Sequence, residues 1–221
     1  MDVNSYYDKI FIINLESRKD RWKNILANLE KFNITNYERF NACFITNLEN
    51  ENKDYYKNFR SNGVLKHGPK YTNGALGCKQ SHLEIMKISK NRHYNKILIL
   101  EDDIFIREKF NEKIKEIHQE LSNIQHDIVM FTGNHQKNPK KITKNLYKIT
   151  ETYCTMGYSI HSNLFDYILS TANSSGLEID VYYCKNIYSR GNSYCVIPHL
   201  IGHIGGYSDI SHKDRGVFKF F

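Results

Sequence analysis

Three short, uninterrupted apolar runs constrain the fold of this chain more than any other feature. Residues 9–13 read Lys-Ile-Phe-Ile-Ile, residues 96–100 read Lys-Ile-Leu-Ile-Leu, and residues 127–131 read Asp-Ile-Val-Met-Phe. Runs of this length and composition are typical of strands, and a strand that is apolar on both faces must be covered on both. Such strands occur in mostly parallel sheets with helices on either side. The runs therefore predict an α/β fold with a mostly parallel central sheet flanked by helices.

Segments with helical spacing separate these strands. Apolar residues recur with helical periodicity after the first run, where Ser17 is placed to cap the helix. A helix-like stretch covers residues 74–89, and another helix follows from Ser162 to about Ala172. The most regular helix has a single apolar stripe formed by Phe110, Ile114, Ile117, Leu121 and Ile124. Alternating strands and helices support the parallel sheet.

The length of 221 residues and the absence of a repeat or linker predict a single domain over residues 1–221. Residues 47–73 are polar and aromatic and predict a long loop or lid, and residues 134–146 predict a second loop rich in Lys and Asn. Ligands bind beyond the carboxyl ends of strands in such sheets. The loops after Ile13, Leu100 and Phe131 are therefore expected to form the ligand-binding edge of the sheet.

Composition excludes several classes of protein. No apolar run approaches the roughly 20 residues of a membrane helix, and the polar N-terminus does not predict a signal peptide. Five cysteines without a C-x-x-C pair argue against both a disulfide framework and a structural zinc site, so reduced thiols in a cytoplasmic protein are expected. The net charge is +7 and the pI about 9.0. This charge is compatible with a phosphate-bearing substrate, while its dispersal argues against nucleic acid.

The second strand ends in three consecutive carboxylates, Glu101-Asp102-Asp103. In extended backbone Glu101 and Asp103 point to the same side, and two converging carboxylates repel each other unless a cation or hydrogen-bond donors lie between them. Mg²⁺ or Mn²⁺ suits such oxygens and leaves positions for a substrate phosphate. The alternative is that the triplet ends the strand and caps a helix that begins near Arg107. The carboxylates thus predict a metal–diphosphate site or, failing that, a helix cap.

Two further segments favour the metal–diphosphate site. The turn after the first strand, residues 14–22, places Arg18 and Arg21 beside a helix N-terminus, where an anion can bind. Residues 73–82 carry two glycines three positions apart, which allow close approach of the backbone, followed by Ser81-His82. An ordinary charged first turn and a core histidine are the plain alternatives.

In this order, the segments resemble glycosyltransferase family 25, which holds lipo-oligosaccharide (LPS biosynthesis) and collagen galactosyltransferases. The matching motifs are Ile13-Asn14-Leu15 with Arg18 and Asp20-Arg21, then Gly74, Gly77-Cys78 and Ser81-His82, then Leu100-Glu101-Asp102-Asp103. Residues 127–131, 155–160 and 178–180 resemble later segments of the family, as does the stretch from Pro198 to Ser208-Asp209-Ile210. The similarity spans nearly the whole chain.

This resemblance implies a GT-A fold and transfer of a hexose (glucose, galactose or N-acetylglucosamine) from a UDP-sugar to a hydroxyl of a glycan or glycoprotein, with inversion. It implies Mn²⁺ or Mg²⁺ as the cofactor. Asp103 is the expected metal ligand, and Glu101 and Asp102 are expected to hold the metal, the ribose or the sugar. The remaining residues expected to bind the donor are Asn14, Leu15, Arg18, Arg21, Gly74, Ser81 and His82.

Two further roles remain to be assigned. An inverting transfer needs a base near the acceptor hydroxyl; Asp180 is the first candidate, with Glu178 and Asp127 in reserve, although Asp180 could equally cap a helix. A histidine late in the chain could complete the metal site. His203 is favoured over His199 because it lies within a glycine-rich turn.

Three other functions are compatible with parts of the sequence. A catalytically inactive GT-A module could bind a glycan or a protein partner. A basic nucleic-acid-binding protein would explain the charge. A sugar-phosphate nucleotidyltransferase shares the metal and nucleotide chemistry, but it normally has a glycine-rich loop after the first strand, and residues 14–22 contain no glycine. The sequence leaves the oligomeric state open.

Overall fold

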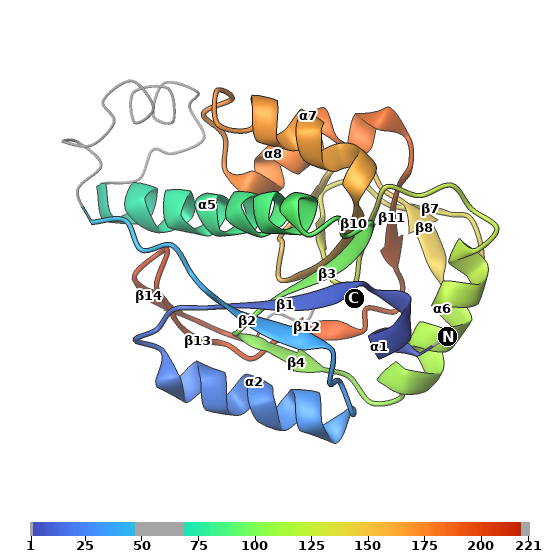
Figure 1. Cartoon of the computed structure of the whole chain (residues 1–221), viewed down its shortest axis with the longest axis horizontal. Helices are drawn as coiled ribbons and strands as arrows, with labels where there is room; N and C mark the ends of the chain where they lie inside the picture. The colour runs from blue at the N-terminus through green and yellow to red at the C-terminus, as the bar shows by residue number, and fades with distance from the viewer. Residues whose placement is uncertain (1, 47–68, 218–221) are drawn as a thin grey trace.

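The computed structural model describes residues 2–46 and 69–217, which form layers of helices around a central sheet (Figure 1). The sheet has eight strands, in spatial order β2 (Tyr37–Asn41), β1 (Lys9–Asn14), β3 (Lys96–Glu101), β10 (Gly157–His161), β5 (Ile128–Met130), β11 (Ser193–Val196), β8 (Leu146–Lys148) and β7 (Lys140–Lys141). The three apolar runs therefore all lie in strands of one sheet.

Most strands of this sheet run in one direction. β1 pairs in parallel with both β2 and β3, and β5 pairs in parallel with β11. β10 is antiparallel to both of its neighbours, β3 and β5, so those two strands point the same way. β8 is antiparallel to β11 and to β7. The prediction of a mostly parallel central sheet is thus confirmed.

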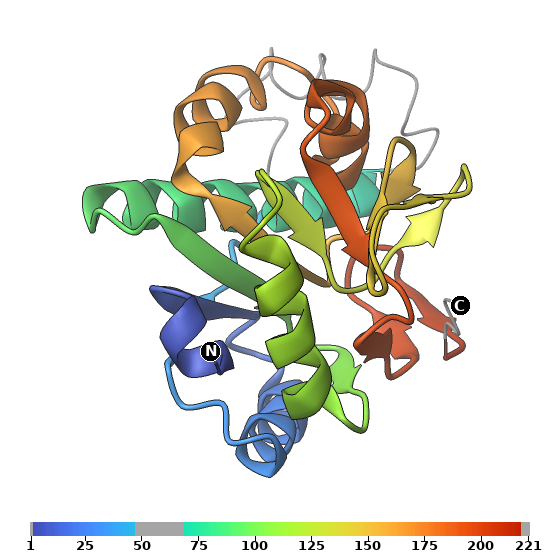
Figure 2. The same ribbon diagram turned by 90° about the vertical axis from the view of Figure 1, so that its right-hand side faces the viewer.

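Helices cover both faces, as the apolar runs require. α5 (Pro69–Asn91), α7 (Phe165–Thr171) and α8 (Ile179–Asn186) lie on one face; α1 (Val3–Tyr6), α2 (Lys19–Lys31) and α6 (Phe110–Leu121) lie on the other (Figures 1 and 2). β1 contributes Ile10 and Ile12 to one apolar core and Phe11 and Ile13 to the other. Alternate side chains of a strand point to opposite faces, so an uninterrupted apolar run can serve two cores.

Three two-stranded sheets in the described part of the chain bring distant segments to the carboxyl end of β3. β4 (Ile104–Ile106) pairs antiparallel with β12 (Ile201–His203), and β13 (Gly206–Ser208) pairs with β14 (Lys213–Arg215). β6 (Asn134–His135) pairs with β9 (Thr152–Tyr153), and two 3₁₀ turns, η1 (Ser162–Leu164) and η2 (Tyr188–Arg190), complete the described elements. None of the described helices is long and apolar enough to cross a membrane.

Several local predictions need correction. Ser17 does not cap α2, because the helix begins at Lys19 with Arg18 at its N-cap and without a side-chain cap among the described residues. Most of the predicted loop over residues 47–73 lies outside the described residues, and its last residues, from Pro69 on, belong to α5. The loop over 134–146 contains β6 and β7. The apolar stripe of α6 is confirmed: its four helical members are buried and Ile124 packs against them.

Gly77 shows why α5 lies so close to the segment after β2. A Cβ atom built on Gly77 would lie 2.5 Å from the backbone oxygen of Cys43, and backbone cannot rotate away as a side chain can. We expect Gly77→Ala to lower the free energy of unfolding by about 1–3 kcal/mol, as overpacking does. Urea denaturation measures this change. Gly216→Ala is the matched control, because its Cβ meets nothing within 4 Å among the described residues; an equal effect of both substitutions would contradict the steric explanation.

Candidate active site

Two cavities meet at the carboxyl end of β3. The first has a volume of about 330 Å³ and lies between the end of β1, the segment after β2, and α5. The second, of about 280 Å³, lies between β9 and the start of α8. Both are lined by Glu101 and Asp103, whereas Asp102 lines only the first. The expectation that Glu101 and Asp103 face the same side thus agrees with the structure.

The acidic triplet is followed by a strand, so it does not cap a helix. Glu101 is the last residue of β3, Asp102 and Asp103 form a turn, and β4 begins at Ile104. The next helix, α6, starts only at Phe110 rather than near residue 107. The helix-cap alternative therefore does not apply.

Arg21 neutralises part of the charge of this turn. Its Nη1 lies 2.9 Å from Asp102 Oδ1 and 3.2 Å from Asp103 Oδ2, and its Nη2 donates to the backbone oxygen of Tyr207 at 2.6 Å. Asn14 Nδ2 donates to Asp102 Oδ2 at 2.6 Å. Burial nevertheless raises the pKa of Asp102 to about 6, against the opposing effects of Arg21 and Asn14. Arg21 and Asn14 thus orient the carboxylates.

His203 and Asp103 form the other contact of the turn. β12 pairs with β4 so that His203 is opposite Ile104, and His203 Nε2 lies 3.3 Å from Asp103 Oδ2. Burial disfavours the charged form of Asp103, but the hydrogen bond from His203 and the charge of Arg21 outweigh it, so its pKa is lowered. Asp103 Oδ1 is buried and has no hydrogen-bond partner among the described residues. His199 instead lies 3.1 Å from His135, between their Nε2 atoms.

Asp180 lines the second cavity, as do Glu101 and Asp103. It is in the first turn of α8, where Oδ2 accepts from the backbone N–H of Cys154 at 3.0 Å and Oδ1 from that of Val181 at 2.8 Å. Burial raises the pKa of Asp180, and the negative charge of Glu101 adds to this effect. Glu178 lines the same cavity.

Asp127, the other reserve base, is not brought to the site. It precedes β5 and therefore lies at the opposite edge of the sheet, where it accepts from Asn163 at 2.7 Å and from Asn192 at 3.1 Å. It lines neither cavity. The structure therefore does not bring Asp127 together with the acidic triplet, and its carboxylate links the loops at the opposite edge.

Some of the residues expected to bind the donor line the first cavity, and others are held by neighbouring side chains. Leu15, Gly74 and Ser81 line the first cavity, together with Arg21 and the acidic turn. Arg18 lines neither cavity, because its guanidinium is held by Asp20 and Asp209. The amide of Asn14 is also fully engaged. At the start of α2, both guanidiniums that were predicted to bind an anion face carboxylates in this structure.

The glycines and Ser81 of α5 serve packing as well as the cavity. A Cβ on Gly74 would lie 2.8 Å from Ile210 Cα, so this glycine allows the C-terminal segment to approach the helix. Ser81 Oγ donates to the backbone oxygen of Gly77 at 2.7 Å and accepts from the N–H of Cys43 at 2.9 Å. The close backbone approach that the two glycines allow is thus to the chain itself.

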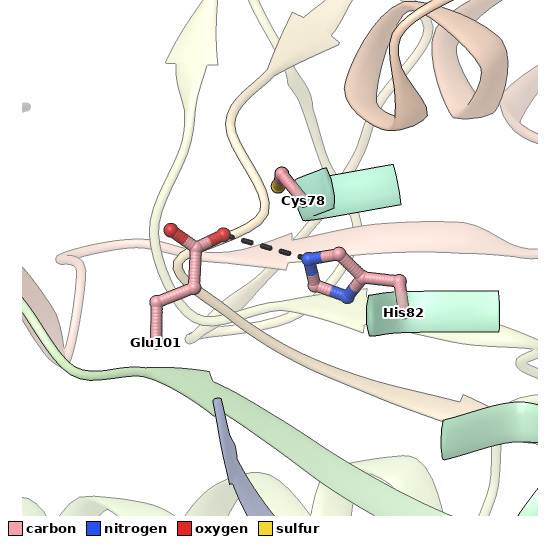
Figure 3. A group of neighbouring side chains, drawn as sticks. All are labelled: Cys78, His82 and Glu101. Carbon is pink, nitrogen blue, oxygen red and sulfur yellow. Dashed lines mark ion pairs between the residues drawn. The ribbon is translucent and has the colours of Figure 1, made fainter. Parts of the chain in front are cut away.

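Thr155 fixes Glu101, and two residues of α5 lie beside the same carboxylate (Figure 3). His82 Nε2 lies 3.6 Å from Glu101 Oε1, and Thr155 Oγ1 donates to the same oxygen at 2.9 Å. His82 is fully buried, and its Nδ1 lies 2.8 Å from the Tyr158 hydroxyl. Cys78, one helical turn before His82, points toward the same carboxylate (Figure 3). His82 is thus a buried histidine that lies beside a residue of the acidic triplet.

Sequence reasoning missed three residues that shape the site. Arg39 donates to Asn14 Oδ1 from Nε at 3.0 Å and from Nη2 at 2.6 Å, and so fixes the amide that holds Asp102. Thr155 orients Glu101, and Asp209 holds Arg18 while lining the first cavity. Arg39 carries no local signal of its contact, because β2 and β1 become neighbours only in the folded sheet. Thr155 and Asp209 do belong to segments with family resemblance.

Comparison with known proteins gives the relatives of this chain. Procollagen galactosyltransferase 2 of Mus musculus is 27% identical over 168 residues, covering 70% of this chain and 26% of the relative. Inactive glycosyltransferase 25 family member 3 of Homo sapiens is 26% identical over 168 residues, covering 70% and 27%. The chain thus spans about a quarter of the length of these relatives.

Solved structures with a similar trace include A197 from STIV, with a TM-score of 0.48, 13% identity, and coverage of 93% of this chain and 91% of that one. A glycosyltransferase involved in the glycosylation of the major capsid of PBCV-1 has a TM-score of 0.45, 12% identity, and coverage of 85% and 80%. The sequence profile described as Glycosyltransferase family 25 (LPS biosynthesis protein) matches residues 7–183. The match covers most of the 221 residues and confirms the resemblance, so this chain belongs to glycosyltransferase family 25.

Proposed function

We propose that this chain transfers a hexose (glucose, galactose or N-acetylglucosamine) from a UDP-sugar to a hydroxyl of a glycan or glycoprotein acceptor, with Mn²⁺ or Mg²⁺ and with inversion. One observation carries the proposal: Glu101 and Asp103 stand at the junction of two cavities, with a candidate base, Asp180, lining the second. A transferase needs two adjoining sites, because donor and acceptor must meet at the reacting carbon. We assign the first cavity to the donor and the second to the acceptor.

The residues at the junction fit a divalent ion. Asp103 offers a buried oxygen, Oδ1, that has no partner among the described residues, and a carboxylate left in this state is costly. Glu101 offers a second carboxylate on the same two cavities. Hard cations such as Mg²⁺ and Mn²⁺ prefer oxygen ligands. Asp103 and Glu101 would hold the ion, which when bound supplies positive charge to the diphosphate leaving group.

His203 can complete this set only after a change of tautomer. Its Nδ1 accepts the backbone N–H of Gly205 at 2.9 Å, so the neutral ring carries its proton on Nε2, toward Asp103. A metal ligand needs a free lone pair on that nitrogen. Ligation through Nε2 would therefore move the proton to Nδ1 and break the hydrogen bond from Gly205.

Asp180 is the proposed base. Its carboxylate lines the second cavity with Glu178, within the volume assigned to the acceptor. Two backbone N–H groups fix its orientation. The raised pKa brings a carboxylate closer to the range in which a general base works best.

The experiment that tests the proposal is a donor screen by hydrolysis and by thermal shift, with and without Mn²⁺. We expect one UDP-hexose to raise the melting temperature in the presence of Mn²⁺ and to be hydrolysed slowly, because water can replace the acceptor. EDTA should abolish both effects. Failure of every UDP-sugar to bind or react would contradict the proposal.

The second candidate function is that of an inactive module that binds a glycan or a partner. One relative, which is named as inactive, supports considering it. It predicts that the UDP-sugars are not turned over while a glycan still binds. The same screen, extended to glycan binding, separates the two functions. A nucleic-acid-binding function would instead appear as binding with a steep dependence on salt.

A further inference from the structure

A second group of metal-binding side chains lies beside the acidic turn, on its α5 side. Cys78 and His82 are four residues apart on α5, so they are neighbours on one face of the helix. With Glu101 they form a cluster in which Sγ, a ring nitrogen and a carboxylate oxygen all lie within 4.8 Å of one another (Figure 3). Thiol, imidazole and carboxylate are together a ligand set for zinc rather than for magnesium.

The distance between the histidine and carboxylate ligand atoms suits a tetrahedral ion. Zn–N is about 2.0–2.1 Å and Zn–O about 2.0–2.2 Å, which at a tetrahedral angle places the two ligand atoms about 3.4 Å apart. His82 Nε2 and Glu101 Oε1 are 3.6 Å apart. This separation is too long for a hydrogen bond, yet it accommodates an ion between the two atoms after a small adjustment.

His82 supplies an independent observation that points to a ligand. The ring is fully buried, and its Nε2 has no hydrogen-bond partner among the described residues, although it is aimed at Glu101. An unpartnered nitrogen at this depth costs free energy unless something binds it. The opposite nitrogen, Nδ1, is 2.8 Å from the Tyr158 hydroxyl. That hydroxyl can accept a hydrogen bond from Nδ1–H and donate one to the Tyr183 hydroxyl at 2.9 Å.

These outer contacts are the kind that accompany a metal-bound histidine. A ligating imidazole usually donates its other N–H to an acceptor, which fixes the tautomer that leaves the ligating nitrogen free. Tyr158 meets this need for His82. Thr155 does the equivalent for the carboxylate, because its hydroxyl donates to Glu101 Oε1. Two of the three ligands are therefore already oriented.

We propose that Cys78, His82 and Glu101 form a site for a thiophilic divalent ion such as Zn²⁺, separate from Asp103 and His203. When the ion binds, Cys78 releases its thiol proton to solvent as the sulfur–metal bond forms, and the cavities on which Cys78 lies leave room for water as the fourth ligand. Glu101 is common to both groups of ligands. An ion bound here draws its carboxylate toward α5, so Zn²⁺ should lower sugar transfer; this consequence rests on the proposed function.

Cobalt titration of the full chain tests the site without any assay of transfer. A sulfur-to-cobalt charge-transfer band in the near ultraviolet reports a thiolate ligand. We expect the wild type to show this band, one equivalent of Zn²⁺ to abolish it, and excess Mg²⁺ to leave it unchanged. Cys78→Ser should lose the band and bind Zn²⁺ at least ten-fold more weakly, and His82→Gln should weaken Zn²⁺ binding as well.

Cys43→Ser is the matched control, because Cys43 lines the first cavity without belonging to the cluster. It should keep both the band and the Zn²⁺ affinity, and circular dichroism of each variant checks that it is folded. A band that persists in folded Cys78→Ser, or a wild type without the band, overturns the site. Because the readout is spectroscopic, its failure is distinguishable from failure of the proposed sugar transfer.

Discussion

Replacing Asp103 with asparagine is expected to reduce sugar transfer by at least about 100-fold and to weaken Mn²⁺ binding. The reason is that the substitution removes the negative charge of a carboxylate whose Oδ1 has no partner among the described residues. Charge stabilisation by a metal ion contributes several kcal/mol to such a transition state, and each 1.4 kcal/mol corresponds to about a factor of ten. Transfer kinetics, together with a Mn²⁺ titration monitored by calorimetry, measure both effects.

The fold should survive this substitution. Asparagine has the same shape, and Arg21 keeps Asp102 and the backbone oxygen of Tyr207 as partners. Removing one of two adjacent acids also relieves their repulsion. We therefore expect the free energy of unfolding to change by no more than about 1 kcal/mol.

Asp127→Asn is the matched control, since it makes the same change in a buried carboxylate at the opposite edge of the sheet. It should leave transfer by the folded protein unchanged.

A second comparison concerns the histidines. His203→Ala should weaken Mn²⁺ binding by about ten-fold or more, a loss of about 1.4 kcal/mol, and His199→Ala should not. Wild-type metal binding by Asp103→Asn would show that the ion is held elsewhere.

The sheet could be predicted from the sequence because the composition of its strands shows that both of their faces are buried. Residues 9–13 and 96–100 are apolar at every position after the first, which is possible only where both faces are covered, and the structure places their alternate side chains in two separate cores. The stripe of α6 was predictable for a similar reason. The spacing of apolar residues shows which side of an element is buried, and the buried side determines how the element packs.

The contacts within the site were harder to predict, because they join residues that are distant in sequence. His203 meets Asp103 only because β12 pairs with β4, and a three-residue strand such as β4 gives almost no signal of its own. Arg18 and Arg21 were expected to bind an anionic group of the donor. The fold brings Asp102, Asp103 and Asp209 to them instead, and those carboxylates come from other parts of the chain.

Asp127 shows the limit of reading function from residue type. An acidic residue next to a buried strand was a reasonable reserve base, but it stands before the strand rather than after it. In a mostly parallel sheet this difference places it at the wrong edge. The edge is decided by the order of residues along the strand, which the sequence does contain.

Asp180→Asn is expected to reduce kcat by about 10²–10⁴-fold, the usual contribution of a general base, while UDP and Mn²⁺ still bind. The base acts as the carboxylate, which prevails above its pKa. Burial and the charge of Glu101 raise that pKa from 3.8, so wild-type kcat/KM should fall on acidification at a higher pH than an ordinary aspartate would give. A pH profile measures this acid limb, and the residual activity of the variant should lack it.

Structural damage can be separated from loss of the base. An asparagine side chain has one oxygen, so it cannot accept from both Cys154 and Val181, and some loss of stability is expected. Damage to the fold would weaken donor binding, whereas loss of the base would lower turnover alone; a thermal shift with UDP and Mn²⁺ distinguishes the two.

Glu178→Gln tests the neighbouring carboxylate of the same cavity. If Glu178→Gln abolishes turnover and the acid limb while Asp180→Asn retains both, the base is Glu178. Asp180 would then serve only to cap the start of α8 and to anchor it to the backbone of Cys154.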